Sequence, residues 1–132
     1  MATGHFEEFD PLIEIQLTGA SDHPARSLVC LVDTGSTGFL SVPEASAERL
    51  GLVPQDTLNI EYADGSTANR SMCLGIASIN GTQGQGVAAL EPSLKHPLLG
   101  IRFLQVLGLK LLIDQRNGIV ELSPSPEQST VY

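Results

Sequence analysis

The stretch Leu28-Val29-Cys30-Leu31-Val32-Asp33-Thr34-Gly35-Ser36 decides both the fold of this chain and the chemistry it can carry. Its first part is short and apolar, as in a strand that lies in the interior of a sheet. This strand runs directly into Asp33, whose carboxylate is costly to bury unless neighbouring groups hydrogen-bond to it. Gly35 lets the backbone turn sharply and brings amide hydrogens near the carboxylate, while Thr34 and Ser36 add hydroxyl groups. Asp33 is therefore a candidate catalytic acid.

One carboxylate is not sufficient for hydrolysis of an amide. That reaction needs two carboxylates that share a proton across a water molecule, one acting as base and the other as acid. The chain contains one such motif, so the second carboxylate would have to come from another copy of the same chain across a two-fold axis. If Asp33 is catalytic, the sequence predicts a homodimer.

The composition predicts one globular domain and excludes several classes of partner. The chain has 132 residues, of which 42% are hydrophobic and 17% charged, with 13 Gly and 8 Pro, which is typical of short elements separated by turns. Its net charge is −8 and it has no basic cluster, so nucleic acid and anionic membranes are poor partners. No apolar run reaches the roughly 20 residues that span a bilayer, and the segment from Met1 to Asp10 lacks the features of a secretory signal. We therefore expect a cytoplasmic protein.

The two cysteines do not indicate a metal site. Cys30 and Cys73 lie far apart, without a second nearby cysteine and without a histidine at ligand spacing. A single disulfide is an alternative, but in a reducing compartment two buried free thiols are the better interpretation. We expect neither a metal ion nor a cofactor.

The segments around the Asp33 motif favour a mostly β domain. Leu12–Leu17 and Leu58–Tyr62 alternate apolar and polar residues, as half-buried strands do. Asp64-Gly65 supplies a two-residue hairpin turn after the second of these strands. Two more hairpin turns are predicted at Asn80-Gly81 and Asn117-Gly118.

Two short helices are predicted within this β pattern. Ser41 followed by Pro43 and Glu44 has the features of a helix N-terminus, and this helix would extend from Pro43 to Leu50. Ile101–Leu107 has helical spacing. Residues 123–132, poor in apolar side chains, are expected to form a disordered tail.

These segments together resemble the retropepsin-like aspartic proteases, which include the retroviral proteases and small single-lobed bacterial relatives. Asp33-Thr34-Gly35-Ser36 resembles the catalytic loop of the family, and Tyr62-Ala63-Asp64-Gly65-Ser66 lies where the family has its flap, a hairpin that closes over bound peptide. Pro97-Leu98-Leu99-Gly100, followed by Ile101-Arg102-Phe103-Leu104, resembles a second hallmark, two apolar residues and a glycine that pass behind the catalytic loop and lead into a helix. An isolated Asp-Thr-Gly is a weak signal, but this combination is specific.

The resemblance implies a single-lobed acid-protease fold. The protease domain would occupy residues 11–122 as a closed β-barrel with two short helices, a flap hairpin and an active site shared by a homodimer. Residues 1–10 would form either a frayed end or a strand at the dimer interface. Several residues beyond Gly108 have no counterpart in the shorter retroviral proteases, so the interface is expected to be built differently here.

The resemblance also implies roles for individual residues. Asp33 would be the catalytic acid, Thr34 would brace the loop against the second subunit, and Gly35 would contact the backbone of a peptide substrate in extended conformation. Many retroviral proteases have Ala where this chain has Ser36, and a hydroxyl donating to the carboxylate would shift the pH optimum toward acid. The residues expected to bind substrate are Ser36, Tyr62, Ala63, Asp64 and Gly65.

Three functions are compatible with these observations. The first is an active homodimeric aspartic endopeptidase. The second is a catalytically silent module that binds peptides, and the third is a dimerising regulatory domain cut from a larger protein. The intact Asp33-Thr34-Gly35 favours the protease, because a silent relative has no reason to retain a carboxylate that is costly to bury.

Overall fold

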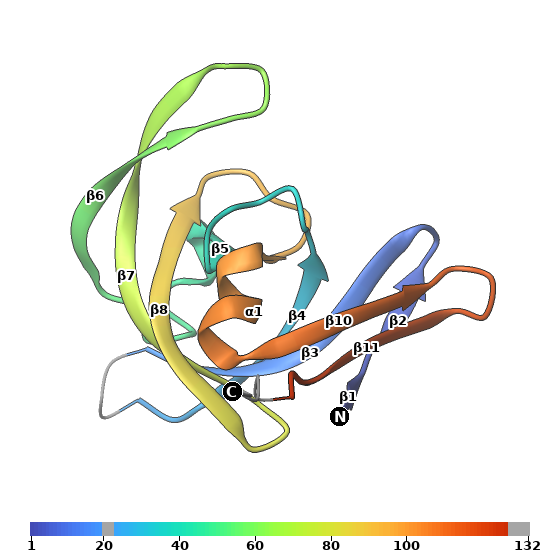
Figure 1. Ribbon diagram of the computed structural model, residues 1–132. Helices are drawn as coiled ribbons and strands as arrows, with labels where there is room; N and C mark the ends of the chain where they lie inside the picture. Colours follow the sequence, from blue (N-terminus) through green and yellow to red (C-terminus); the bar gives the residue numbers. More distant parts are fainter. Residues whose placement is uncertain (20–22, 127–132) are drawn as a thin grey trace, which may run out of the picture.

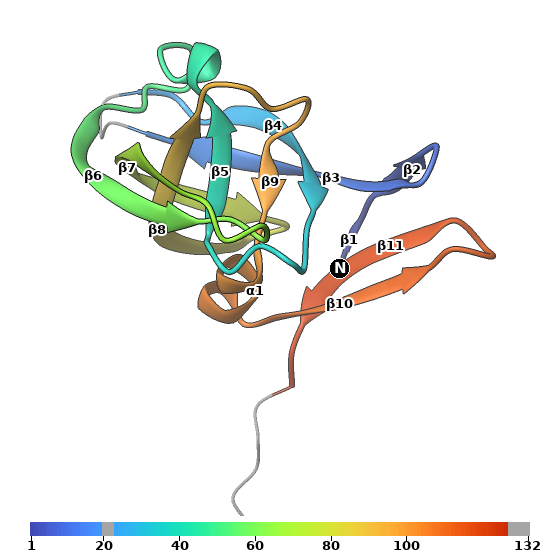
Figure 2. The same ribbon diagram turned by 90° about the horizontal axis from the view of Figure 1, so that it is seen from above.

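The structure of the chain, a computed structural model, describes residues 1–19 and 23–126. Within these residues the chain forms two β-sheets, one α-helix and one short 3-10 helix (Figures 1 and 2). The mostly β architecture predicted from the sequence is confirmed. No helix in this part of the chain is long and apolar enough to cross a membrane.

The smaller sheet has three antiparallel strands in the order β1 (Ala2–Thr3), β11 (Ile119–Pro124) and β10 (Leu109–Asp114). The larger sheet has eight strands in the order β2-β3-β4-β9-β5-β8-β7-β6. A further antiparallel pairing joins β3 to β7. The sheet is therefore strongly curved, because β3 and β7 are separated by four strands in this order and are nevertheless hydrogen-bonded to each other. The strands of the larger sheet are β2 (His5–Glu7), β3 (Asp10–Thr18), β4 (Arg26–Val32), β5 (Leu40–Pro43), β6 (Pro54–Glu61), β7 (Thr67–Ile79), β8 (Thr82–Glu91) and β9 (Leu98–Leu99).

All three predicted hairpins are present. The β6–β7 hairpin projects at the upper left of Figure 1. Its turn has the five residues 62–66 and not the two residues predicted, because strand pairing ends at Glu61 and Thr67. Between β7 and β8, Asn80 and Gly81 both have positive φ angles, of 51° and 85°, as a two-residue turn between twisted strands requires. The last hairpin joins β10 to β11 and includes Gly118 at φ 65°.

One of the two predicted helices is correct and the other is wrong. Ile101–Leu107 forms helix α1, which ends at Gly108 in the left-handed conformation with φ 63°. The helix expected from Pro43 to Leu50 is replaced by β5 and a single 3-10 turn, Glu44–Ser46. Ser41 cannot cap a helix, because β5 lies between β8 and β9 and pairs with both. These long-range pairings outweigh the local helix signals.

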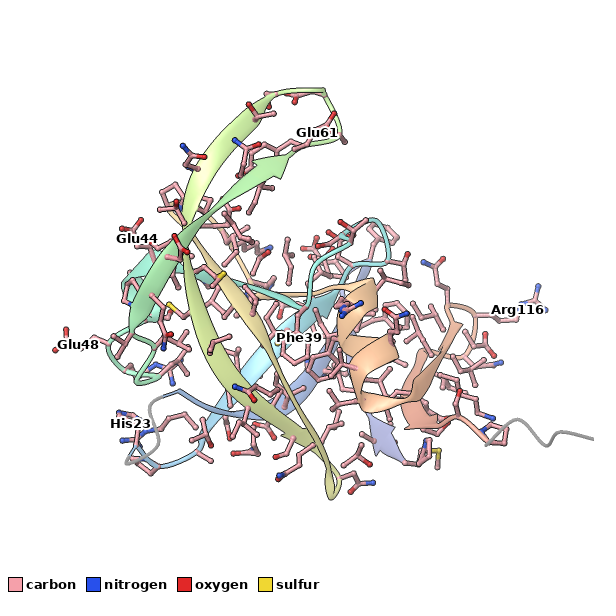
Figure 3. All side chains as sticks on the ribbon, turned by 60° about the vertical axis from the view of Figure 1, so that its left-hand side comes forward. His23, Phe39, Glu44, Glu48, Glu61 and Arg116 are labelled. Atoms are coloured by element: carbon pink, nitrogen blue, oxygen red, sulfur yellow. The ribbon has the colours of Figure 1, made fainter. Side chains whose placement is uncertain are left out.

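The core lies between the curved sheet and α1. Phe39 and Phe103 are both buried, with ring centroids 5.1 Å apart. Figure 3 shows Phe39 inside the molecule, whereas Glu44, Glu48 and Arg116 extend outward from it. The two cysteines are buried free thiols, in agreement with the sequence interpretation.

The ends of the described chain are paired. The sequence left a frayed end and an interface strand open for residues 1–10. In the structure this segment is not frayed, because β1 pairs with β11 and β2 pairs with β3. At the other end, β11 continues to Pro124, two residues into the segment expected to be disordered, and the Ser125 amide donates to the Gly108 carbonyl at 2.8 Å. The remainder of the expected tail, residues 127–132, lies outside the described residues.

Candidate active site

Asp33 lies directly after β4, at the start of a loop that extends to Phe39. Its side chain is half-buried. The Gly35 amide donates to Asp33 Oδ1 at 3.0 Å, and the Ser36 amide donates to the Asp33 carbonyl at 3.1 Å. The glycine therefore supplies the amide hydrogen that the sequence predicted next to the carboxylate. We name residues 33–39 the Asp33 loop.

Strand β9 and the first residues of α1 attach to this loop through the backbone. Strand β9 runs parallel to β4, with Leu99 opposite Val32. The apolar-apolar-glycine segment thus passes behind the Asp33 loop, as the resemblance implied. Four backbone hydrogen bonds join the two segments. The Asp33 amide donates to the Leu99 carbonyl at 2.9 Å, and the Gly100 amide donates to the Phe39 carbonyl at 3.1 Å. At the start of α1, the Ile101 amide donates to the Ser36 carbonyl at 2.8 Å and the Arg102 amide to the Gly38 carbonyl at 3.1 Å.

Gly100 makes this close approach sterically feasible. A Cβ atom at this position would lie 2.1 Å from the carbonyl oxygen of Gly38, and 3.0 Å from that of Ser36. Any side chain would therefore push the Asp33 loop away from α1. The requirement for glycine comes from space, since its φ of −93° is open to every residue.

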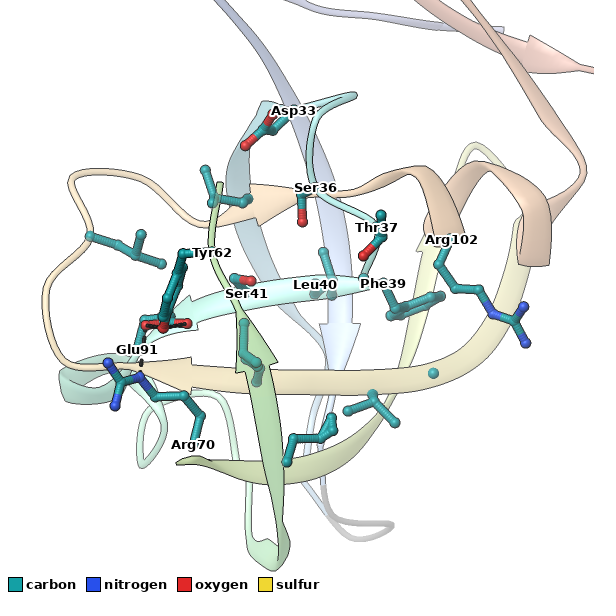
Figure 4. A pocket seen from close by; sticks show the side chains of 18 of the residues that line it. Asp33, Ser36, Thr37, Phe39, Leu40, Ser41, Tyr62, Arg70, Glu91 and Arg102 are labelled. Atoms are coloured by element: carbon teal, nitrogen blue, oxygen red, sulfur yellow. Dashed lines mark hydrogen bonds and ion pairs between the residues drawn. The ribbon is translucent and has the colours of Figure 1, made fainter. Parts of the chain in front are cut away.

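A cavity of about 1240 Å³ opens beside Asp33, between the Asp33 loop, β8 and the β6–β7 hairpin (Figure 4). Its volume is ample for several residues of an extended peptide. Apolar side chains form much of the wall, and they include Phe39, Leu40, Leu58, Ile60, Val87, Leu94 and Leu98.

The cavity contains five of the eight residues that the sequence assigned to the site, namely Asp33, Gly35, Ser36, Tyr62 and Ala63. Thr34, Asp64 and Gly65 are exposed and do not line it. Thr34 was expected to face a second subunit, and that expectation stays a prediction. Asp64 and Gly65 lie at the tip of the β6–β7 hairpin, so their contact with substrate also stays a prediction.

The Ser36 hydroxyl has a different place from the one the sequence suggested. Within the described part of the chain, no hydrogen bond joins this hydroxyl to the Asp33 carboxylate. Figure 4 shows the Ser36 side chain pointing into the cavity and away from Asp33. The proposed acid shift of the pH optimum loses the contact on which it depended.

Asp64 holds the tip of the hairpin together. Its Oδ1 accepts hydrogen bonds from the amide and the hydroxyl of Ser66, at 2.9 and 2.6 Å. Both bonds stabilise the charged form of the exposed Asp64 carboxyl and so lower its pKa, and the bond from the Ser66 hydroxyl has the larger effect. The tip is a turn closed by a side chain.

A second carboxylate, which the sequence interpretation missed, lies in the same cavity. Glu91 ends β8 and is only 9% exposed. Both of its carboxylate oxygens accept a hydrogen bond from the Tyr62 hydroxyl, each at 3.0 Å. Oε2 also accepts a hydrogen bond from Arg70 Nε at 2.9 Å (Figure 4). We name Glu91, Tyr62 and Arg70 the Glu91 cluster.

The contacts within the Glu91 cluster shift the pKa values of Tyr62 and Arg70. Burial, and then the hydrogen bond to Glu91, raise the pKa of Tyr62, while the same carboxylate raises the pKa of Arg70. One signal in the sequence could have found Glu91. It follows the apolar run Val87-Ala88-Ala89-Leu90, just as Asp33 follows the apolar residues of β4.

The described residues contain no group of three or more His, Cys, Asp or Glu side chains placed to hold a metal ion. The polar groups of the cavity are carboxylates, hydroxyls, amides and two arginines. What the cavity can supply chemically is a half-buried carboxylate beside an apolar groove.

The fold matches solved retroviral proteases. EIAV protease, in complex with the inhibitor HBY-793, has a TM-score of 0.56 and 21% identity over 80% of this chain and 95% of that one. Simian foamy virus (mac) protease has a TM-score of 0.46 and 18% identity over 70% of this chain and 91% of that one. No protein-family model and no curated protein sequence matches the chain. The match to EIAV protease shows that the chain has the retropepsin-like, single-lobed protease fold.

Proposed function

We propose that this protein is an aspartic endopeptidase whose active site forms when two copies bring their Asp33 carboxylates together. The observation that carries the proposal is the position of Asp33. It lies at the end of an interior strand, in a loop attached to β9 and α1, and at the edge of a large groove lined by apolar side chains.

The proposed chemistry uses a water molecule between the two carboxylates. One Asp33 accepts a proton from the water, whose oxygen forms a bond to the carbonyl carbon of the peptide, while the protonated Asp33 of the second copy donates to the carbonyl oxygen. In the next step the carbon–nitrogen bond breaks, and the leaving nitrogen takes the proton held by the first carboxylate. One hydroxyl of the intermediate returns its proton to the Asp33 of the second copy as the new carboxylic acid forms, so the pair again holds one proton. The sharing of one proton by two close carboxylates keeps one acid and one base present together.

The need for a second copy follows from the contents of the cavity. Besides the half-buried Asp33, the described residues that line it include two carboxylates, Glu61 and Glu91. Glu61 is exposed, and Glu91 is already bound by Arg70 and Tyr62. Figure 4 places Glu91 well away from Asp33. A two-fold axis next to Asp33 would supply an equivalent carboxylate, and the exposed Thr34 is available to meet its copy there.

Cleavage of a mixed peptide library from about pH 3 to about pH 7, by the wild type and by Asp33→Asn, tests the proposal. We expect the wild type to cleave and the variant to be slower by about 10³-fold or more. The asparagine keeps an oxygen that can accept the Gly35 amide, so the variant should fold. Sedimentation of both proteins at several concentrations would show whether they dimerise.

Three results would contradict the proposal. Equal cleavage by both proteins would exclude Asp33 as the catalytic acid. A strict monomer at high concentration would exclude a shared site. If a folded, dimeric wild type binds peptides without cutting them, the alternative of a catalytically silent peptide-binding module is correct.

A further inference from the structure

The outer part of the β6–β7 hairpin, residues 57–71, extends beyond the body of the molecule. Strand β7 pairs with β8 from Ile79 back to Met72, which lies opposite Ala89, and the pairing ends there. Beyond Met72, the strand pairings of both β6 and β7 are to each other. The backbone hydrogen bonds of the turn, between Tyr62, Gly65 and Ser66, also stay within the hairpin. We name residues 57–71 the outer arm.

The Glu91 cluster joins this outer arm to the body through side chains. Glu91 comes from the body, at the end of β8, whereas Tyr62 and Arg70 come from opposite strands of the arm. A single carboxylate thus accepts hydrogen bonds from both sides of the hairpin. The Arg70–Glu91 contact is the ion pair found in the described part of the chain.

We propose that Glu91 is a positioning residue, which holds the outer arm over the cavity by binding Tyr62 and Arg70. The inference deepens the proposed function, since the groove that the arm covers is the one in which the peptide would be cut. Glu91 would act on substrate binding without taking part in proton transfer.

Burial of the Glu91 carboxylate makes the contact strong. The Glu91 side chain is 12% exposed and the Arg70 side chain 26%, so the carboxylate has little water to replace a lost partner. Removing one partner of such a pair leaves a poorly solvated charge. Strand pairing holds only the base of the outer arm, and the position of the arm over the cavity is therefore coupled to these three side chains.

This coupling predicts how the variants behave kinetically. An arm that is already in place loses little freedom when a peptide binds beneath it. A loosened arm must be ordered at that step, so binding weakens while the carboxylates that do the chemistry are untouched. We expect KM to rise about tenfold in Glu91→Ala, with kcat within about twofold of the wild type.

The chain offers a direct spectroscopic test of the contact. It contains 2 tyrosines and no tryptophan, so Tyr132→Phe leaves Tyr62 as the sole tyrosine. In that background, the ultraviolet absorbance of the phenolate gives the pKa of Tyr62. Glu91→Gln should lower this pKa because it removes the negative charge, and Arg70→Met should raise it because it removes the positive one. Glu48→Gln, an equal change of charge at an exposed position of the body, should leave it in place.

Amide hydrogen exchange tests whether the contact positions the arm. Tyr62→Phe removes only the hydroxyl and retains the ring, so it should fold as the wild type does. In Tyr62→Phe, Arg70→Met and Glu91→Ala, the amides of the outer arm should exchange faster, while those paired between β7 and β8 stay protected. Glu91→Gln retains an acceptor and should be affected less than Glu91→Ala.

Two results would overturn the inference. If Glu91→Gln leaves the Tyr62 pKa unchanged, the contact is absent in solution. If all three variants exchange in the outer arm as slowly as Glu48→Gln, the contact exists but does not position the arm.

The inference and the proposed function can fail separately. A wild type that cuts no peptide would refute the proposed protease, and the tyrosine titration and the exchange rates would still judge the role of Glu91. Cleavage that is lost in Asp33→Asn, combined with an outer arm that no variant loosens, would refute the positioning role alone.

Discussion

Two parts of the molecule face the same cavity and are held in contrasting ways. The Asp33 loop is attached to β9 and α1 by backbone hydrogen bonds, at a point where even a Cβ atom on Gly100 would not fit. The outer arm of the β6–β7 hairpin is attached to the body by the side chains of the Glu91 cluster. The first attachment is independent of side-chain rotation and ionisation, and the second depends on both.

The difference agrees with what each part would do in a protease. A catalytic carboxylate must keep its place within a fraction of an ångström, and backbone contacts provide this. A hairpin that covers a peptide has to open and close, and side-chain contacts allow this without any loss of strand pairing. Four predictions test this contrast.

Gly100→Ala should have the largest effect on stability. Its Cβ would lie 2.1 Å from the Gly38 carbonyl oxygen, so the loop or the helix must move, at a cost of about 2–4 kcal/mol in the free energy of unfolding. Gly38→Ala is the matched control, because a Cβ there meets nothing within 4 Å. Urea denaturation measures both. Equal stability of the two variants would show that the loop is not tightly attached.

Cys30, on β4 beneath the Asp33 loop, should make the protein sensitive to alkali. Burial raises the pKa of its thiol from 9.0 to about 12, so the folded state keeps a proton that the unfolded state loses. The contribution of this thiol to stability should therefore be constant below about pH 9 and fall by about 1.4 kcal/mol per pH unit between the two pKa values. Chemical denaturation at several pH values should show a shallower decline in Cys30→Ala. An unchanged slope would contradict the burial of the thiol.

Gly65→Ala should affect substrate binding more than folding. Gly65 has φ 85° at the tip of the outer arm, where alanine is strained by about 1 kcal/mol. Gly118→Ala, at φ 65° in the β10–β11 hairpin, introduces the same kind of strain away from the cavity. We expect similar losses of stability in the two variants, and a raised KM in Gly65→Ala. A raised KM in both would show that the effect comes from general destabilisation.

The smallest expected effect is at Asp64. Because the bonds from Ser66 lower the pKa of its carboxyl, they stabilise the turn above the ordinary pKa, and this contribution is lost as the pH falls through the lowered value. The NMR shift of the Ser66 amide should therefore titrate with a midpoint below 3.8, and Asp64→Asn should abolish this titration. A midpoint at or above 3.8 would contradict the contact.

Local sequence signals predicted some parts of the molecule and misled on others. The turns at Asn80-Gly81 and Asn117-Gly118 and the helix Ile101–Leu107 form as expected, because each depends on the conformational preferences of a few adjacent residues. The helix predicted at Pro43–Leu50 fails, although its local signals were also present. There, the pairing of β5 with β8 and β9 decides the conformation.

The candidate site divides in the same way. The carboxylate of Asp33 and the amide of Gly35 meet across two residues, so the sequence alone predicted their contact. Glu91 lies far along the chain from both Tyr62 and Arg70, and no local pattern reports that these side chains meet. The direction of the Ser36 hydroxyl likewise depends on the shape of a cavity to which several strands contribute.

By itself, the sequence determined the strand that ends in an acid, the glycine that turns the chain beside it, and the positions of the hairpin turns. These features follow from the stereochemistry and the polarity of neighbouring residues. Only the tertiary structure decided that Ser41 belongs to a strand, that Gly100 lies against Gly38, and that one buried carboxylate joins the outer arm to the body. Contacts of this kind form between segments that the fold brings together, and their energies depend on a burial that no local stretch of sequence specifies.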